Sequence, residues 1–219
     1  MAGEVRIDGR VAAKASDSVQ EGHDISVAPR SRYVGRGGIK LEGAIAHFGI
    51  VCAGKIGLDI GASTGGFTDC LLQHGALKVF AVDVGHGQLA WKIRDDPRVI
   101  TLEKTNARYL SRAEIAEPNE ICVIDVSFIS LTLILPNAFE LLTPDGVILA
   151  LIKPQFELAR SDIGRGGIVR SAELHEKAQQ KVVAFAETMG ARVGGLFPSS
   201  ITGTDGNQEF FICLRKPSA

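Results

Sequence analysis

The sequence has little net charge, few aromatic residues and no long hydrophobic run. Its 219 residues include 24 lysines and arginines against 25 acidic residues, so the formal net charge is −1. A chain this balanced is not basic overall, and a nucleic-acid partner would have to meet a local basic patch. The apolar runs are far shorter than the roughly 18 residues of a membrane span, and no signal peptide is recognisable. We therefore expect a cytoplasmic protein that does not insert into membranes.

Cysteine and tryptophan are also scarce. The four cysteines form no C-x-x-C pair, and three of them lie in apolar runs. This pattern predicts buried thiols in a reducing compartment, without a zinc site or any other metal. The single tryptophan, Trp91, lies in a stretch of helical character, and core packing is its expected role.

Glycine, by contrast, is abundant, and its 25 copies gather in short clusters instead of a linker. From residue 56 onward, apolar runs of strand length alternate with amphipathic stretches of helical period. This alternation predicts an α/β fold with a mostly parallel sheet, helices on both faces and ligands at the carboxyl ends of the strands. A helix is expected over residues 171–189, with Ser171 as its N-cap. The seven expected strands, of which the last two form an antiparallel hairpin, are IGLDI, KVFAVDV, RVIT, ICVIDV, VILALIK, ARVGGLFPSS and QEFFICLRK.

The glycine cluster GASTGG follows the first of these strands and opens a helix, a position where cofactors approach the backbone. A dinucleotide loop would need glycine in place of Ser63, which disfavours an NAD-dependent oxidoreductase, and a P-loop would need lysine in place of Phe67. S-adenosylmethionine has nucleoside and amino-acid ends but no phosphate, and backbone N–H groups with Ser63 or Thr64 could hold its carboxylate. The cofactor-binding residues predicted here are Gly61, Ala62, Ser63, Thr64, Gly65, Gly66 and Phe67.

Polar residues follow the next two strands. Asp83 ends the second strand, 22 positions beyond Gly61, where a carboxylate can accept hydrogen bonds from ribose hydroxyls. Its alternative role is a helix N-cap. Asn106 follows the third strand and either contacts the adenine or caps a helix.

Four charged residues lie at the ends of apolar segments. Asp125 and Lys153 each end a strand, Glu209 begins the last strand, and Lys40 precedes the first helix. Charges in such places are costly unless they are paired or used, and the plain alternative is one structural ion pair with two solvated residues. The set suits proton removal from a hydroxyl beside a methyl donor. We expect Lys153 to act as the base, because a neighbouring cation such as Lys40 favours a neutral amine.

In this interpretation Asp125 and Glu209 position the two lysines, and Asp125 also borders the cofactor. Attack on the methyl group then depends on proximity and alignment, and no metal is required.

Seven motifs occur in order along the chain: SRYVGRGGIKLEGAI, LDIGASTGGFTDCLL, AVDVGHGQLAWKIR, TNARYL, VIDVSFISL, LIKPQFE and GNQEF. Together they resemble the TlyA family, a haemolysin A-like branch of the FtsJ-like ribosomal RNA methyltransferases. The resemblance implies a Rossmann-like, S-adenosylmethionine-dependent enzyme that methylates ribose 2′-hydroxyls of cytidines in 16S or 23S ribosomal RNA. It also implies a K-D-K-E catalytic set, matched here by Lys40, Asp125, Lys153 and Glu209.

The resemblance further divides the chain. Residues 30–219 correspond to the FtsJ-like methyltransferase domain, whereas residues 1–29 resemble only the second half of an S4 RNA-binding domain. Family members begin with the complete S4 domain. Either the chain is a truncated form, or its start was placed late, or this version works without the helical half.

The charge is unevenly distributed, with −2 over residues 1–29, +4 over residues 30–41 and +2 over residues 153–170. The two basic segments are expected to contact phosphates of ribosomal RNA in the ribosomal subunits. A rival hypothesis is a non-catalytic RNA-binding or membrane-active protein that kept the fold, but it would have no need of all four charged residues. The arginines predicted to contact RNA are Arg30, Arg32, Arg36, Arg160, Arg165 and Arg170.

Overall fold

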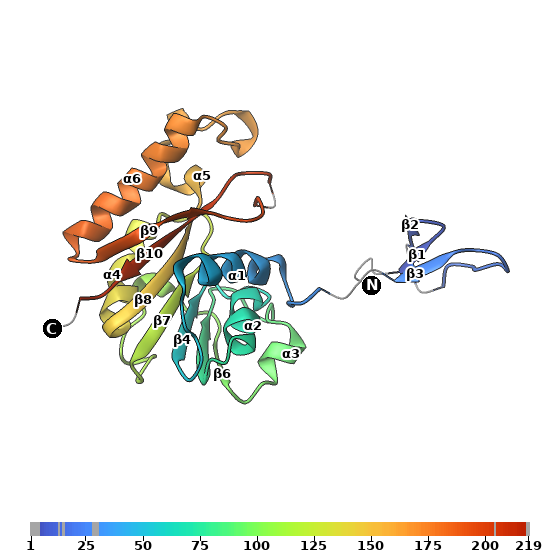
Figure 1. Cartoon of the computed structure of the whole chain (residues 1–219), viewed down its shortest axis with the longest axis horizontal. Helices are drawn as coiled ribbons and strands as arrows, with labels where there is room; N and C mark the ends of the chain where they lie inside the picture. The colour runs from blue at the N-terminus through green and yellow to red at the C-terminus, as the bar shows by residue number, and fades with distance from the viewer. Residues whose placement is uncertain (1–4, 13, 15, 28–30, 204, 218–219) are drawn as a thin grey trace. The chain divides into compact units, whose positions relative to one another are not determined.

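The chain divides into two compact units, Met1–Arg32 and Tyr33–Ala219. The computed structural model describes residues 5–12, 14, 16–27, 31–203 and 205–217 (Figure 1). Each unit has its own sheet.

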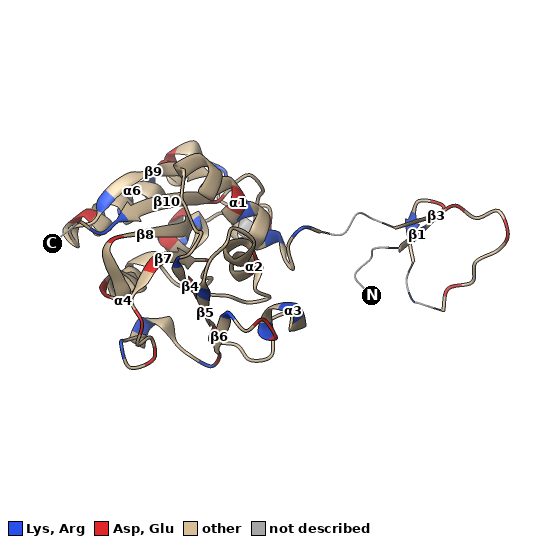
Figure 2. Ribbon diagram, turned by 60° about the horizontal axis from the view of Figure 1, so that its bottom comes forward, with Lys and Arg blue, Asp and Glu red and all other residues tan. Residues whose placement is uncertain are grey.

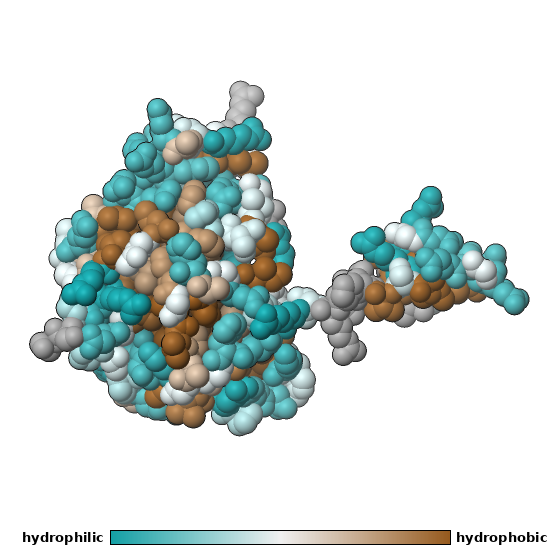
Figure 3. Space-filling view, viewed as in Figure 1, coloured by the Kyte–Doolittle hydropathy of each residue, from teal (hydrophilic) through white to brown (hydrophobic). Residues whose placement is uncertain are grey.

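The smaller unit is an antiparallel sheet of three short strands in the order β2-β1-β3: β1 is Val5–Ile7, β2 is Arg10–Val11 and β3 is Ile25–Val27. Asp8 and Gly9, between β1 and β2, both have positive φ angles, 51° and 77°, as a tight hairpin turn requires. Several branched apolar side chains of these strands are exposed and form a hydrophobic patch along one side of the unit (Figure 3). The relation of residues 1–29 to an S4 domain stays a prediction.

The larger unit is built on a seven-stranded sheet in the order β6-β5-β4-β7-β8-β10-β9 (Figure 1). Strands β4 to β8 pair in parallel, and β10 pairs antiparallel with both β8 and β9. The predicted α/β, Rossmann-like architecture with its antiparallel last strand and closing hairpin is confirmed. The strands are β4 (Ile56–Ile60), β5 (Lys78–Val82), β6 (Val99–Leu102), β7 (Asn119–Ile124), β8 (Leu142–Ile152), β9 (Arg192–Pro198) and β10 (Phe210–Arg215).

Helices cover both faces of this sheet. Residues of α1, α2 and α3 pack on one face and residues of α4 and α6 on the other. Successive strand residues feed opposite cores, so that Val123 faces α1 and α2 while Ile124 faces α4 and α6. This explains why the central strands are apolar at nearly every position. The helices are α1 (Arg36–Phe48), α2 (Gly66–Gln73), α3 (Trp91–Arg94), α4 (Leu135–Leu141), α5 (Pro154–Glu157) and α6 (Ala172–Thr188), and the 3₁₀ turns are η1 (Ala107–Tyr109), η2 (Leu131–Leu133), η3 (Arg160–Asp162) and η4 (Arg165–Gly167).

Local predictions fare unequally. Ser171 caps α6 as expected, since its Oγ accepts a hydrogen bond from the backbone N–H of Leu174. All four cysteines are buried free thiols. The prediction for Trp91 is wrong, because 75% of this residue is exposed. Helix α3 is a single turn, and Ile93 is the one member that it buries in the core.

The surface mixes both signs of charge. Figure 2 shows lysine and arginine beside aspartate and glutamate over the helices and loops, while the central strands carry little charge. Among the described residues, no helix combines the length and the hydrophobicity that a membrane span requires.

Candidate active site

Two adjoining cavities lie at the carboxyl ends of the parallel strands. One, of about 240 Å³, is the charged cavity, and the other, of about 420 Å³, is the apolar cavity. Both open where the fold class predicts a ligand. They share the wall residues Gly61, Ser63, Asp125, Ser127 and Phe128.

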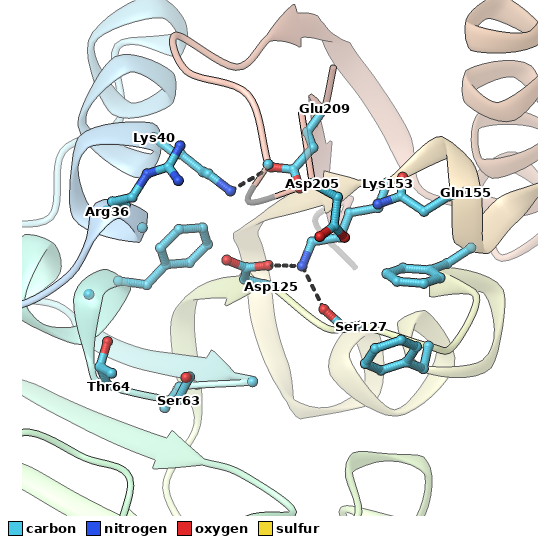
Figure 4. A pocket seen from close by; sticks show the side chains of 18 residues that line it. Arg36, Lys40, Ser63, Thr64, Asp125, Ser127, Lys153, Gln155, Asp205 and Glu209 are labelled. Carbon is cyan, nitrogen blue, oxygen red and sulfur yellow. Dashed lines mark hydrogen bonds and ion pairs between the residues drawn. The ribbon is translucent and has the colours of Figure 1, made fainter. Parts of the chain in front are cut away.

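The charged cavity brings together the four charged residues singled out in the sequence. Lys40 comes from α1, Asp125 follows β7, Lys153 follows β8 and Glu209 precedes β10. Figure 4 shows their side chains reaching into one space from opposite walls.

The four charges form two ion pairs. Lys40 Nζ lies 2.5 Å from Glu209 Oε2, and these side chains are only 9% and 3% exposed. Lys153 Nζ lies 2.6 Å from Asp125 Oδ1, with exposures of 11% and 21%, and it also donates a hydrogen bond of 2.9 Å to Ser127 Oγ. The alternative of one structural pair with two solvated residues is therefore wrong. Each carboxylate holds one lysine, as the positioning hypothesis requires.

A further carboxyl group, Asp59, lies buried in β4 behind this site. Burial, together with the nearby charges of Asp125 and Asp83, raises its pKa to about 7 against the lowering effect of Thr68. Thr68 Oγ1 donates a 2.6 Å hydrogen bond to Asp59 Oδ2, and Oδ1 has no hydrogen-bond partner among the described residues. The sequence analysis missed Asp59, although an acid inside the apolar run IGLDI was a usable signal.

The glycine loop runs between the two cavities and α2. Gly61 and Gly65 have φ angles of 86° and 92°, a backbone conformation that would be strained in a residue with a side chain. In addition, a Cβ at Gly61 would collide with the carbonyl oxygen of Asp125. Ser63 also has a positive φ, 47°, and its backbone N–H donates a 2.8 Å hydrogen bond to Asp83 Oδ2. Helix α2 begins directly after the loop, so its first N–H groups have no partner within the helix.

Asp83 and Asn106 both line the apolar cavity, and both also make local hydrogen bonds. Asp83 Oδ1 accepts from the backbone N–H of Gly85 at 2.7 Å, so that its carboxylate ties the glycine loop to the end of β5. Each of its oxygens has a second lone pair that a ribose hydroxyl could use. The Asn106 side chain accepts from the backbone N–H of Arg108 and caps η1, which is the capping role that the sequence left open.

The structure adds neighbours that the sequence analysis did not single out. Ser127 and Phe128 follow Asp125 directly, and Gln155 and Phe156 follow Lys153, so their place in the same motifs was the available signal. Phe128 is 89% exposed and has a φ angle of 64°. Its ring lies 5.0 Å from the ring of Phe156.

The predicted RNA-binding arginines are dispersed. Arg36 lines the charged cavity and donates a 2.9 Å hydrogen bond to the carbonyl of Thr202. Arg160 and Arg170 are exposed on the segment between α5 and α6. Arg32 belongs to the smaller unit, and Arg30 and the side chain of Arg165 lie outside the described residues.

Asn207, which is buried, fastens the segment between α5 and α6 to the chain that leads into Glu209. Its Oδ1 accepts from the backbone N–H of Val169 at 2.8 Å, and its Nδ2 donates to the carbonyl of Gly167 at 3.0 Å. The arginine-bearing segment and one wall of the charged cavity are thus joined.

Comparison with known proteins gives consistent matches. A family model for FtsJ-like methyltransferases matches residues 33–216. YqxC of Bacillus subtilis is 50% identical over 187 residues, which are 85% of this chain and 66%, just under two thirds, of that protein. The 16S/23S rRNA (cytidine-2′-O)-methyltransferase TlyA of Mycobacterium tuberculosis is 44% identical over 216 residues, 98% of this chain and 81% of that protein. A solved structure from Streptococcus thermophilus shares 46% identity, with a TM-score of 0.86, over 100% of this chain and 81% of that one.

Proposed function

Because the chain belongs to the FtsJ-like methyltransferase family, we propose that it transfers a methyl group from S-adenosylmethionine to a ribose 2′-hydroxyl of ribosomal RNA. The observation that carries the proposal is the pair of lysine–carboxylate contacts in a cavity that shares a wall with the glycine loop. A ribose hydroxyl is a weak acid, and its attack on a methyl group benefits from a positioned base. The name of the mycobacterial relative makes cytidine of 16S or 23S ribosomal RNA the proposed acceptor.

The residues of the apolar cavity fit S-adenosylmethionine. Val84, Ala107 and Val126 would contact the adenine, and Asp83 would accept hydrogen bonds from the ribose hydroxyls. The first N–H groups of α2, with Ser63 and Thr64, would hold the amino-acid end, since the absence of a Cβ at Gly61 lets a ligand come close to the backbone. When bound, the cofactor supplies a methyl group activated by a positively charged sulfur. The loop residues of the predicted cofactor set, Gly61, Ala62, Ser63, Thr64, Gly65, Gly66 and Phe67, line the cavities or open α2.

In the proposed mechanism Lys153 is the general base. Its neutral amine takes the proton of the 2′-hydroxyl, and the resulting ammonium group is held by Asp125 at the 2.6 Å separation seen here. The hydroxyl of Ser127 orients the amine. Lys40, fixed by Glu209, is the stationary cation that stabilises negative charge on the ribose oxygen.

Binding of the RNA is proposed to involve phosphate contacts beside the cavity. Arg36 at its wall, and Arg160 and Arg170 on the segment anchored by Asn207, are the candidates. Such contacts position RNA without reading its sequence. Ribosomal subunits in the cytoplasm are the proposed partners, and residues 1–29 are proposed to add RNA contacts as part of an S4-like module.

The test is transfer of labelled methyl groups to purified ribosomal subunits from cells that lack this modification, with Lys153→Ala as the control. The wild-type protein is expected to label ribosomal RNA at a ribose, and Lys153→Ala to label none. Equal labelling by both would refute the mechanism. A non-catalytic RNA-binding protein would instead bind the subunits and transfer nothing. Calorimetry with S-adenosylmethionine and with NAD separates the proposed cofactor from the rival one.

A further inference from the structure

Glu157 is a buried carboxylate that the proposed mechanism does not use. It ends α5, and its side chain is 1% exposed. Glu157 Oε1 accepts a 2.7 Å hydrogen bond from the backbone N–H of Leu131, and Oε2 accepts one of 2.5 Å from Ser130 Oγ. A buried charge is costly unless its surroundings compensate it, so the site is built around this group.

Lys181 on α6 completes the compensation. Its Nζ lies 3.2 Å from Glu157 Oε2 and donates hydrogen bonds to the backbone carbonyl of Glu157 at 2.7 Å and to Ser130 Oγ at 3.3 Å. One carboxylate thereby joins α5, α6 and the segment that leads into η2.

The two segments joined by Glu157 carry the proposed base, Lys153, and its hydrogen-bond partner, Ser127. Lys153 is the N-cap of α5 and lies one turn before Glu157, with its carbonyl accepting from the backbone N–H of Phe156 at 2.9 Å. Ser127 and Phe128 begin the segment that ends at Ser130 and η2. The segments thus meet twice: inside the cavity, where Lys153 donates to Ser127, and behind it, at Glu157.

The backbone between these two contacts is strained. Phe128 has a φ angle of 64°, a left-handed conformation that a phenylalanine adopts only when its surroundings impose it. Phe128 lies between two contacts with α5: its own ring packs on the Phe156 ring, and the following residues Ser130 and Leu131 donate hydrogen bonds to Glu157.

We propose that Glu157 is a positioning residue for Lys153. By fastening the Ser127 segment to α5, it sets the distance between the Lys153 amine and the Ser127 hydroxyl and so the direction in which the amine meets its substrate. The inference rests on the proposed function in naming Lys153 as the base.

The kinetic test uses Glu157→Gln, which keeps the shape and one acceptor but removes the charge. The matched control is Glu120→Gln, because Glu120 also accepts a backbone hydrogen bond, from Ile56 at 3.2 Å, but at the amino end of β4. We expect kcat to fall at least tenfold in Glu157→Gln, with KM for S-adenosylmethionine changed less than twofold, and no change in the control. The double variant with Ser127→Ala should be no slower than the slower single variant. An unchanged kcat, or fully multiplicative losses, would overturn the inference.

A second measurement needs no enzymatic activity. The rate at which acetic anhydride modifies Lys153, followed by mass spectrometry of peptides, reports how firmly its amine is held. We expect at least threefold faster modification in Glu157→Gln and an unchanged rate in Glu120→Gln. Equal rates of Lys153 modification in the wild type and both variants would contradict the positioning role. A wild-type protein that methylates no RNA would refute the proposed function and leave this measurement valid. If Glu157→Gln does not fold, Lys181→Gln replaces it. The modification rate of Lys153 should then also increase, by about half as much on a logarithmic scale.

Discussion

Lys40 and Lys153 face the same cavity and each contacts one carboxylate, but their surroundings differ. The Lys40–Glu209 pair joins a long helix to the start of the last strand and is closed off, with exposures of 9% and 3%. The Lys153–Asp125 pair lies at two strand ends, has an exposure of 21% on the carboxylate side, and includes a third group, Ser127. The two lysines are almost equally covered, at 9% and 11%, so the difference lies in the carboxylates. The Lys40–Glu209 pair is called closed and the Lys153–Asp125 pair open, and the open pair is the one proposed to exchange a proton with a substrate.

Removal of the open lysine is expected to have the largest effect. Lys153→Ala should lower kcat by about 10²–10⁴, the usual contribution of a general base, while binding of S-adenosylmethionine changes little. Single-turnover methyl transfer and calorimetry measure the two quantities. The control is Lys177→Ala, which removes a surface ion pair between Lys177 on α6 and Asp162 in η3. Retention of a third or more of the wild-type rate by Lys153→Ala would assign the base to another residue.

Breaking the closed pair should instead act on stability. Glu209→Gln leaves Lys40 buried without a counter-charge and should lower the free energy of unfolding by about 3–5 kcal/mol. Asp125→Asn should cost less, because that carboxylate is more exposed and Lys153 keeps its hydrogen bond to Ser127. Urea unfolding of the two variants at one pH makes the comparison. Equal losses would mean that the two pairs do not differ in the way their burial indicates.

The pH dependence of stability probes the carboxyl group behind the open pair. Burial raises the pKa of Asp59 to about 7, so the unfolded chain loses this proton near pH 4 while the folded protein keeps it. Stability should therefore fall as pH rises from about 4 to about 7, by at most about 1.4 kcal/mol per unit, and level off above that. Asp59→Asn keeps a side-chain oxygen that can accept the hydrogen bond from Thr68, but it removes the titratable carboxyl group. Urea unfolding between pH 5 and 8 should show a flatter profile for the variant, and parallel profiles would contradict this.

The smallest expected effect concerns Arg36, which lies one helical turn before Lys40. Arg36→Ala should weaken RNA binding only a few-fold and reduce the slope of log K against log[salt] by about 0.7–0.9, the value for one phosphate contact. Arg192→Ala, at the start of the edge strand β9, is the control. Filter binding at several salt concentrations measures both slopes, and identical slopes would remove Arg36 from the RNA contact surface.

Much of the fold follows from the sequence because the strands inside the sheet (β4, β5, β7, β8 and β10) are buried on both faces and are therefore nearly continuous in apolar residues. Because the strands are otherwise apolar, the charged residues Asp125 and Lys153 were conspicuous at the strand ends. What could not be predicted is which side chains meet. Lys40 and Glu209 are separated by 169 positions, and their contact depends on β10 lying beside β8, which no local pattern encodes.

Two other side chains were not predicted correctly, one for a local reason and one for a non-local reason. Trp91 was expected in the core because tryptophan is large and apolar. Helix α3 is only one turn long, however, and the side chain that it buries is that of Ile93. Glu157 reads as an ordinary helical acid in LIKPQFE, and its role depends on Ser130, Leu131 and Lys181, which come from two other elements.

The position of β10 also bears on how the cavity is completed. The strand follows β9 in the chain, yet it lies between β8 and β9 in the sheet, so β9 joins the sheet through β10. Glu209 stands directly before β10 and 169 positions after Lys40. The counter-charge of Lys40 is therefore in place only when β10 has paired with β8. A chain cut before Glu209 would lack both the strand and the counter-charge, and its cavity would be incomplete.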